Sequence, residues 1–381
     1  MQDLFGNLVN DNQIEFPTDY NSIIERIHHI NPIRYASTRN FINGGVTYLS
    51  PYISRGIISI KQVKEVIIKK GYKPYEIDKF LQELAWREYY QRIWQNKNES
   101  IWEDLKQTQP DVLHHEMIQS IVNAKTGIQI IDDQINQFYA TGYLHNHIRM
   151  YLGTIVCNVG KAHWLTPSKW LYYHLLDGDI ASNNCSWQWV AGAFASKKYY
   201  CNQENINKYT FTNQLNTFMD KSYEIIASMP VPETLKETNT LNLASRLPQT
   251  LLPVIDITKP TLIYNSYNID PNWRSEEDVN RVLLLEPSHF NKYPVSDKVI
   301  NFIINLSKNI NGIQVYCGAL EDIEILYKDG TLNLDEAILS KEHPAFNYYT
   351  GKKDNRDWMF PEVSGYYPSF FSYWKKCQKW L

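Results

Sequence analysis

The sequence predicts a mostly α-helical chain that ends in a small α/β domain. Apolar residues recur three and four positions apart in residues 20–30 and 74–95, which is the spacing of amphipathic helices. Residues 126–160 also predict two helices, joined by a break at residues 140–142. Residues 260–318 then give strand–helix–strand order, which is typical of a Rossmann-like parallel sheet.

The composition of residues 228–259 marks a boundary between the two parts. This stretch has several prolines and no sustained hydrophobic period, so it predicts a linker. We therefore expect a helical domain over residues 1–227 and a small α/β domain over residues 260–381. The last forty or so residues are rich in aromatic side chains. We expect them to form a helical tail that packs the domains together.

Composition and charge exclude several classes of protein. Hydrophobic residues make up 43% of the 381 residues and charged residues 21%, as in folded globular proteins. The net charge of −3 gives no overall basic field, although local phosphate contacts remain open. The five cysteines lack ligand-like spacing, so no metal centre is expected. No signal peptide and no membrane-spanning run are apparent, so a cytoplasmic location is expected.

The most unusual stretch is residues 175–189. Its polar and aromatic side chains alternate with small or apolar neighbours; they are Asp177, Asp179, Asn183, Asn184, Trp187 and Trp189. If this stretch is helical from Asp179, then Asp179, Asn183 and Trp187 share one face. Such a face suits a flat cofactor that is rich in heteroatoms. The high aromatic content, 14% of the chain, is equally compatible with stacking surfaces and with a bulky core.

Several motifs occur together in a fixed order over roughly the first 210 residues. They are Tyr35 with Arg39, the run TYLSPY from Thr47, Glu83 followed by WRE, two TG dipeptides, HNHIRM from His145, and DGDIASNN followed by WQWVAG. In this order they resemble the FAD-binding core of the photolyase and cryptochrome family. The resemblance implies an all-helical FAD-binding domain.

The resemblance also implies roles for residues around the flavin. Asp177 pairs with Arg149 at the polar edge of the ring, Asp179 adds an acceptor, and Asn183 lies by the reactive ring nitrogen. Other implied cofactor contacts are Tyr35, Thr47, Ser50, Arg87 and Gly178. Hydroxyls and backbone N–H groups near Ser50 would hold phosphate at a helix start. For that segment taken alone, a capped turn without a ligand is the favoured interpretation.

For activity, the resemblance implies a deoxyribodipyrimidine photo-lyase, a carbon–carbon lyase that uses reduced FAD and blue light to split pyrimidine dimers in damaged DNA. The implied substrate contacts are Arg39, Glu83, Trp86, Asn146, Met150 and Trp189. Of these, Glu83 and Trp86 lie three apart and so can face the same way. A surface carboxylate beside a half-buried indole remains the alternative. Trp164 and Trp187 match the two inner members of the electron-transfer chain of three tryptophans.

The sequence departs from the family pattern at three places. Residues 108–122, where the outer tryptophan of the chain is expected, contain no Trp, Tyr or Phe. His147 stands where an arginine is usual, and residues 191–210 replace the usual ending. These departures favour a second hypothesis, a cryptochrome-like blue-light receptor that binds FAD and signals to a protein partner. The five positions Glu83, Trp86, Asn146, Met150 and Trp189 favour repair.

The α/β domain follows the flavin domain here, whereas in the resembling family it precedes it, as in a circular permutation. It contains no glycine-rich dinucleotide loop and is short, so no antenna chromophore is expected. FAD is thus the one cofactor predicted, with damaged DNA as partner and no membrane. The sequence leaves open the dimer type, the strand preference and the oligomeric state.

Overall fold

The computed structural model describes residues 14–328 and 330–381, which form two compact units. Residues 1–13, where no signal peptide is predicted, lie outside the described range. The first unit contains the residues up to Pro17, Asn31–Thr47 and Glu99–Asn242, and the second contains Thr18–Ile30, Tyr48–Asn98 and Leu243–Leu381. Among the described residues no helix has the length and apolar character needed to span a bilayer.

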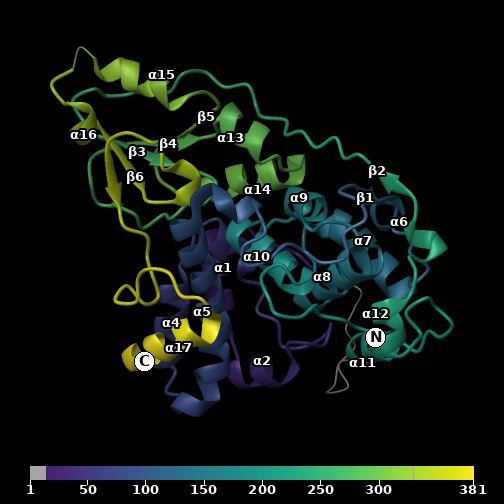
Figure 1. Cartoon of the computed structure of the whole chain (residues 1–381). Helices are drawn as coiled ribbons and strands as arrows, with labels where there is room; N and C mark the ends of the chain where they lie inside the picture. The colour runs from purple at the N-terminus through teal and green to yellow at the C-terminus, as the bar shows by residue number, and fades with distance from the viewer. Residues whose placement is uncertain (1–13, 329) are drawn as a thin grey trace. The chain divides into compact units, whose positions relative to one another are not determined.

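The first unit is built almost entirely of helices (Figure 1). Its helices are α2 (Pro32–Thr38), α6 (Gln119–Val122), α7 (Gln129–Thr141), α8 (Asn146–Gly153), α9 (Leu165–His174), α10 (Ile180–Ala191), α11 (Gln203–Thr210) and α12 (Tyr223–Ser228). A π-helical turn, Thr154–Val159, continues α8, and β1 (Met117–Ile118) pairs with β2 (Thr238–Asn239). The predicted break at residues 140–142 is confirmed, since it separates α7 from α8.

Apolar faces of these helices meet in one core. The core includes the buried side chains of Phe138, Tyr151, Trp164, Trp170 and Trp187, which come from α7, α8 and the segments around α9 and α10. The bulky aromatic residues counted in the sequence therefore serve largely as packing here. This core fixes α8 and α10 against one another, and these two helices carry the central motifs.

The second unit combines helices from the first hundred residues with a parallel sheet. Its helices are α1 (Tyr20–His28), α3 (Ser50–Ser54), α4 (Ile60–Lys69), α5 (Pro74–Lys97), α13 (Pro287–Lys292), α14 (Asp297–Ser307), α15 (Leu320–Glu324), α16 (Leu334–Ala337) and α17 (Phe370–Cys377). The strands are β3 (Thr261–Tyr264), β4 (Asn280–Leu284), β5 (Ile313–Tyr316), β6 (Ile338–Lys341) and β7 (Lys352–Asp354).

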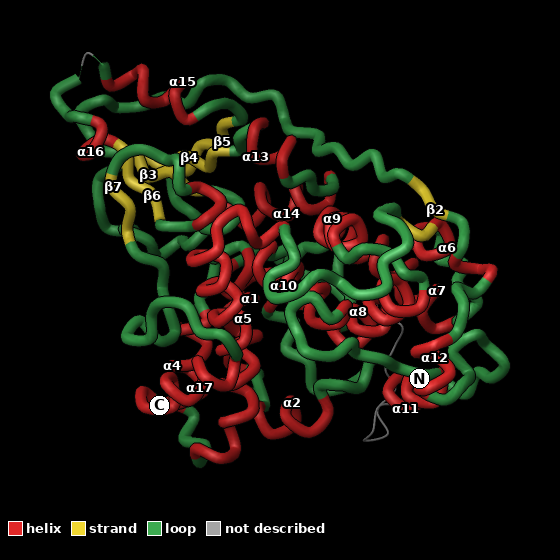
Figure 2. The backbone as a smooth tube through the Cα atoms, in the orientation of Figure 1, coloured by secondary structure: helices red, strands yellow, loops and turns green. Residues whose placement is uncertain are grey.

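The five strands are all parallel and lie in the order β5-β4-β3-β6-β7 (Figure 2). The predicted strand–helix–strand run is confirmed as β4, α14 and β5, with β3 ahead of it. The strands β6 and β7 were not predicted, because each is short and lies in a stretch without a clear period. A mostly α chain with a parallel α/β layer is therefore the observed fold class.

Within the second unit, the C-terminal segment packs on α5 (Figure 1). The carboxylate of Glu88 is buried, and it accepts hydrogen bonds from the backbone N–H groups of Met359 and Phe360 and from the hydroxyl of Tyr373. The guanidinium of Arg92 lies 3.5 Å from the ring centre of Trp358. The tail is thus held by hydrogen bonds to a buried carboxyl group and not by apolar contact alone.

The sheet lies within residues 260–381, as expected. The unit that contains it also includes α1, α3, α4 and α5 from the N-terminal part of the sequence. The domain boundaries at residues 227 and 259 stay predictions, as does the circular permutation.

Candidate functional site

Arg149 and Asp177 form a two-pronged ion pair in the first unit. The Nη2 atom of Arg149 lies 2.9 Å from both carboxylate oxygens of Asp177. Its Nε donates to the carbonyl of Leu144 at 2.8 Å, which fixes the plane of the guanidinium. The side chain of Asp177 is 3% exposed and that of Arg149 is 22% exposed. The structure therefore brings together the two residues that the sequence predicts as a pair.

A glycine at the end of α7 allows this pair to form. Gly142 has φ +73, a left-handed conformation that favours glycine, and its carbonyl accepts the N–H of Leu176 at 2.8 Å. A Cβ at residue 142 would lie 2.7 Å from Cγ of Leu176. The bond joins the loop before α8 to the loop before α10, so Arg149 and Asp177 face each other.

Asp179 and Asn183 lie one turn apart at the start of α10. Asp179 is the N-cap residue, and its carboxylate accepts the N–H of Ser182 at 2.7 Å. The Nδ2 of Asn183 donates to the carbonyl of Ser168 at 2.9 Å, which orients the amide. The helix predicted from residue 179 is confirmed. Trp187, one further turn on, is buried in the core.

Two atoms of this group are available to a ligand. Within the described part of the chain, Nη1 of Arg149 makes no hydrogen bond, and Oδ1 of Asn183 accepts none. A donor from the guanidinium and an acceptor from the amide suit a flat ring that carries both carbonyl oxygens and N–H groups. The donor set therefore fits FAD.

The remaining predicted residues of the first unit lie on several elements. Tyr35 is on α2, Arg39 is the residue that ends α2, and Thr47 follows in a loop. Asn146 and Met150 are four apart on α8, where Nδ2 of Asn146 lies 4.0 Å from Sδ of Met150. Gly178 lies in the turn between Asp177 and Asp179, and Trp189 is 37% exposed on α10.

The other predicted residues belong to the second unit. Ser50 is the first residue of α3, which begins there as expected, although no side chain caps it. Glu83, Trp86 and Arg87 lie on α5, and Nη1 of Arg87 donates to the hydroxyl of Ser54 at 2.9 Å. A common pocket for these residues and those of the first unit stays a prediction.

Glu83 and Trp86 both have neighbours within the second unit. Glu83 pairs with Lys79 at 2.9 Å, so its carboxylate has a cation beside it. The ring of Phe370 stacks on that of Trp86, with centres 3.7 Å apart and planes 10° apart. One face of Trp86 is therefore covered by the C-terminal helix. The sequence could not predict this stack, because 284 residues separate the two rings along the chain.

His145 and His147 at the start of α8 are buried and neutral. Burial, followed by the charges of His147 and Arg149, lowers the pKa of His145 to about 4. Burial and the charge of Arg39 lower the pKa of His147 to about 4. The ring of His147 packs against those of Tyr209 and Tyr151. An imidazole in this setting cannot act as the cation that an arginine would supply for a DNA phosphate.

These two histidines predict that acid destabilises the protein. Both pKa values are lowered from 6.5, so between about pH 6.5 and about pH 4 the unfolded chain binds more protons. The free energy of unfolding therefore falls as the pH decreases through this window. Replacing His147 with phenylalanine keeps an aromatic ring but removes one of the two titratable groups. It should flatten the slope by up to about 1.4 kcal/mol per pH unit, measured by urea unfolding. An unchanged dependence of the free energy of unfolding on pH would contradict the lowered pKa of His147.

Trp164 is fully buried, and its indole N–H donates to Asp104 at 2.7 Å. In the described part of the chain the ring in contact with it is the imidazole of His163, which in turn stacks on His115. The described rings next to Trp164 are thus imidazoles, and residues 108–122 contribute His115 to them but no Trp, Tyr or Phe. An interrupted electron path beyond Trp164 stays a prediction.

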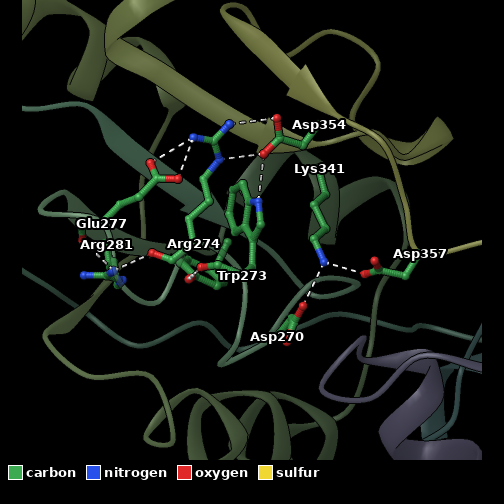
Figure 3. A network of polar contacts seen from close by, with 9 residues as sticks. Asp270, Trp273, Arg274, Glu277, Arg281, Lys341, Asp354 and Asp357 are labelled. Carbon is green, nitrogen blue, oxygen red and sulfur yellow. Dashed lines mark hydrogen bonds and ion pairs between the residues drawn. The ribbon is translucent and has the colours of Figure 1, made fainter. Parts of the chain in front are cut away.

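Charged residues also gather at the carboxyl ends of β3, β6 and β7 (Figure 3). Lys341 contacts Asp270 at 2.8 Å and Asp357 at 2.7 Å. Arg274 bonds Asp354 at 2.7 Å and lowers the pKa of that carboxyl. Because each of these carboxylates has a cationic partner, we interpret the network as a structural tie between loops.

Similarity to known proteins centres on the same helices. Residues 80–230 match the family described as the FAD binding domain of DNA photolyase. A deoxyribodipyrimidine photo-lyase of Synechococcus sp. is 29% identical over 173 residues, which cover 42% of this chain and 35% of that relative. A deoxyribodipyrimidine photo-lyase of Vibrio cholerae is 30% identical over 170 residues, with 41% and 35% covered. A solved cryptochrome structure from Synechocystis sp. has a TM-score of 0.46 and 17% identity, and the match covers 52% of this chain and 44% of that one.

The match with these photo-lyases spans about a third of their length. The family match over residues 80–230 includes α8 and α10, and with them Arg149, Asp177 and Asn183. The helical part of this chain that carries these residues is therefore similar to the FAD-binding domain of DNA photolyases.

Proposed function

We propose that this chain binds FAD and repairs pyrimidine dimers in DNA under blue light. The observation that carries the proposal is the ion pair of Arg149 and Asp177 beside the oriented amide of Asn183. The guanidinium offers a donor and the amide an acceptor on two helices that are fixed in one core, which supports the proposal of a flavin ring beside them. The photo-lyases that match this region support the choice of reaction.

Each residue near this pair has a distinct task in the proposal. Asp177 neutralises Arg149 and holds it at the polar edge of the ring, while Asp179 caps α10 and keeps Asn183 in register. Oδ1 of Asn183 accepts from a protonated ring nitrogen, which favours reduced flavin. Once bound, reduced FAD supplies the electron that splits the dimer on illumination. Tyr35, Thr47, Ser50, Arg87 and Gly178 are the further proposed cofactor contacts.

On the substrate side, we propose that Glu83 accepts a hydrogen bond from a pyrimidine and that the exposed indole of Trp189 provides a stacking surface. A dimer must leave the base stack to be repaired, and aromatic walls lower the cost of that step. Trp86 contributes the partly exposed surface that Phe370 leaves uncovered. Asn146 and Met150 border the dimer, and Arg39 contacts the DNA backbone.

We also propose FAD as the single cofactor, with neither a metal nor an antenna chromophore. The order of the domains, helical first and α/β second, is proposed to reflect a circular permutation, and the cytoplasm is the proposed location. Trp164 and Trp187 are proposed to carry electrons to the flavin.

A second function, a blue-light receptor without repair, is favoured by two specific observations. His147 is buried and neutral, so the usual cation is missing at that position. Phe370 covers one face of Trp86, which reduces the stacking area available to a base. Photoreduced protein incubated with an oligonucleotide that carries one thymine dimer separates the two functions. Loss of the dimer in light and not in darkness supports repair, whereas normal flavin photochemistry with an intact dimer supports sensing.

Replacing Glu83 with glutamine should slow repair by about tenfold to a hundredfold, because a charged acceptor for the pyrimidine becomes a neutral amide. Flavin occupancy should stay at the wild-type level. The matched control is Glu65→Gln, which removes an exposed carboxylate of α4 and should leave both properties unchanged. If Glu83→Gln loses repair and flavin binding to the same extent, the proposed contact of Glu83 with the pyrimidine is wrong.

A further inference from the structure

The C-terminal helix carries a basic and aromatic outer face. Lys375 and Lys376 of α17 and Lys379 just beyond it are exposed, as are the rings of Phe371 and Trp380 at 68% and 53%. Within the described residues no carboxylate pairs with these lysines. From residue 363 onward the sequence has no Asp or Glu, although the whole chain has a net charge of −3. This face is therefore a local positive patch.

The opposite face of α17 is fully used for packing. Phe370, Tyr373, Trp374 and Cys377 are buried, and the hydroxyl of Tyr373 donates to Glu88 on α5 at 2.7 Å. The buried side chains recur at helical spacing, which directs the lysines outward. Because the inner face packs against the rest of the second unit, the outer face is left to solvent.

The helix dipole explains the lysines of this patch but not its exposed aromatic rings. Lysines in a last turn do interact favourably with the helix dipole, and this alone accounts for their presence. It does not account for two large exposed aromatic rings among them. Phe371 and Lys375 lie four residues apart and so share one side of the helix. Alternating cations and aromatic rings suit phosphates and unstacked bases of a nucleic-acid strand.

The helix that carries the patch also contacts a residue proposed to meet the substrate. Phe370, the first residue of α17, stacks on Trp86 of α5, and Tyr366 before the helix lies under the ammonium of Lys97, 4.9 Å from its ring centre. All of these residues belong to the second unit. The inner face of α17 therefore joins the helix that carries the lysines to a residue proposed to meet the substrate.

We propose that the outer face of α17, with Lys379 and Trp380, is an accessory DNA-binding surface that grips the strand flanking the proposed repair site. This inference rests on the proposed function, since it takes DNA as the partner. The lysines contact phosphates without regard to sequence, and Phe371 and Trp380 stack on exposed bases. The surface adds affinity for undamaged flanking DNA and takes no part in the chemistry.

The test uses the full chain and a labelled undamaged single-stranded oligonucleotide, with binding followed by fluorescence anisotropy at several salt concentrations. The variant K375Q/K376Q/K379Q should bind at least about tenfold more weakly at low salt. Its plot of log affinity against log salt should be shallower by about 2 to 3. The variant F371S/W380S should lose affinity for the single strand more than for a duplex. Flavin occupancy should be unchanged in both.

The control variant K125Q/K221Q/K328Q removes the same charge from exposed lysines elsewhere and should stay within about twofold of wild type. Equal losses in the tail and control variants would overturn the proposal, as would unchanged binding in the tail variant. A tail variant that loses binding only to vesicles containing phosphatidylserine would assign the surface to membranes and also overturn it. Wild-type protein that takes up flavin but binds neither this oligonucleotide nor one that carries a thymine dimer would instead refute the proposed repair function, and this inference with it.

Discussion

Replacing Asp177 with alanine is expected to lower the affinity for FAD by on the order of a hundredfold. The substitution leaves the guanidinium of Arg149 without its counterion in a place where the carboxylate side chain is only 3% exposed. Breaking a buried ion pair on one side costs about 3 kcal/mol or more, since the remaining charge is desolvated without a partner. The ratio of flavin to protein absorbance after reconstitution measures the effect.

Two variants control for this result. Asp133→Ala removes an exposed carboxylate of α7 in the same unit and should keep full flavin occupancy. Asp177→Asn retains hydrogen-bond acceptance without the charge, so it should fall between wild type and Asp177→Ala. Full flavin occupancy in Asp177→Ala would show that the ion pair of Arg149 and Asp177 is not needed for flavin binding.

Replacing Glu88 with alanine is expected to release the C-terminal tail and to destabilise the protein by about 3 kcal/mol or more. Burial raises the pKa of Glu88, and the bonds from Tyr373, Met359 and Phe360 oppose that rise. Without the carboxylate, two buried backbone N–H groups and one hydroxyl lose their hydrogen-bond acceptor. Urea unfolding measures the loss, and limited proteolysis reports faster cleavage beyond residue 357.

Tyr373→Phe is the matched comparison, because it removes one of the three donors and leaves the carboxylate in place. Its cost should be about 1 kcal/mol. If Glu88→Ala costs no more than Tyr373→Phe, the carboxylate does not hold the tail.

The sequence could predict what depends on local patterns. The amphipathic period at residues 74–95 predicted the long helix α5. The apolar runs around residues 261–317 predicted three of the five strands. The pairing of Arg149 with Asp177 was also predicted, from the family motifs. The paired residues lie in compact motifs, so their relation follows from short segments of defined conformation.

Contacts over long sequence separations could not be predicted. The carboxylate of Glu88 finds its donors more than 270 residues away, and Phe370 covers Trp86 across a similar distance. The burial of His147 depends on Tyr209 of α11, which no pattern near residue 147 signals. Such contacts arise from tertiary packing, and packing determines whether a matched motif residue is free to meet a ligand.

The absorption spectrum of the purified full-length chain, recorded before and after reconstitution with FAD, tests the central claim most directly. We predict flavin bands that stay with the protein through gel filtration and that are bleached by photoreduction under blue light. A protein that is folded by circular dichroism, yet stays colourless after reconstitution, would contradict a flavin site formed by Arg149, Asp177 and Asn183.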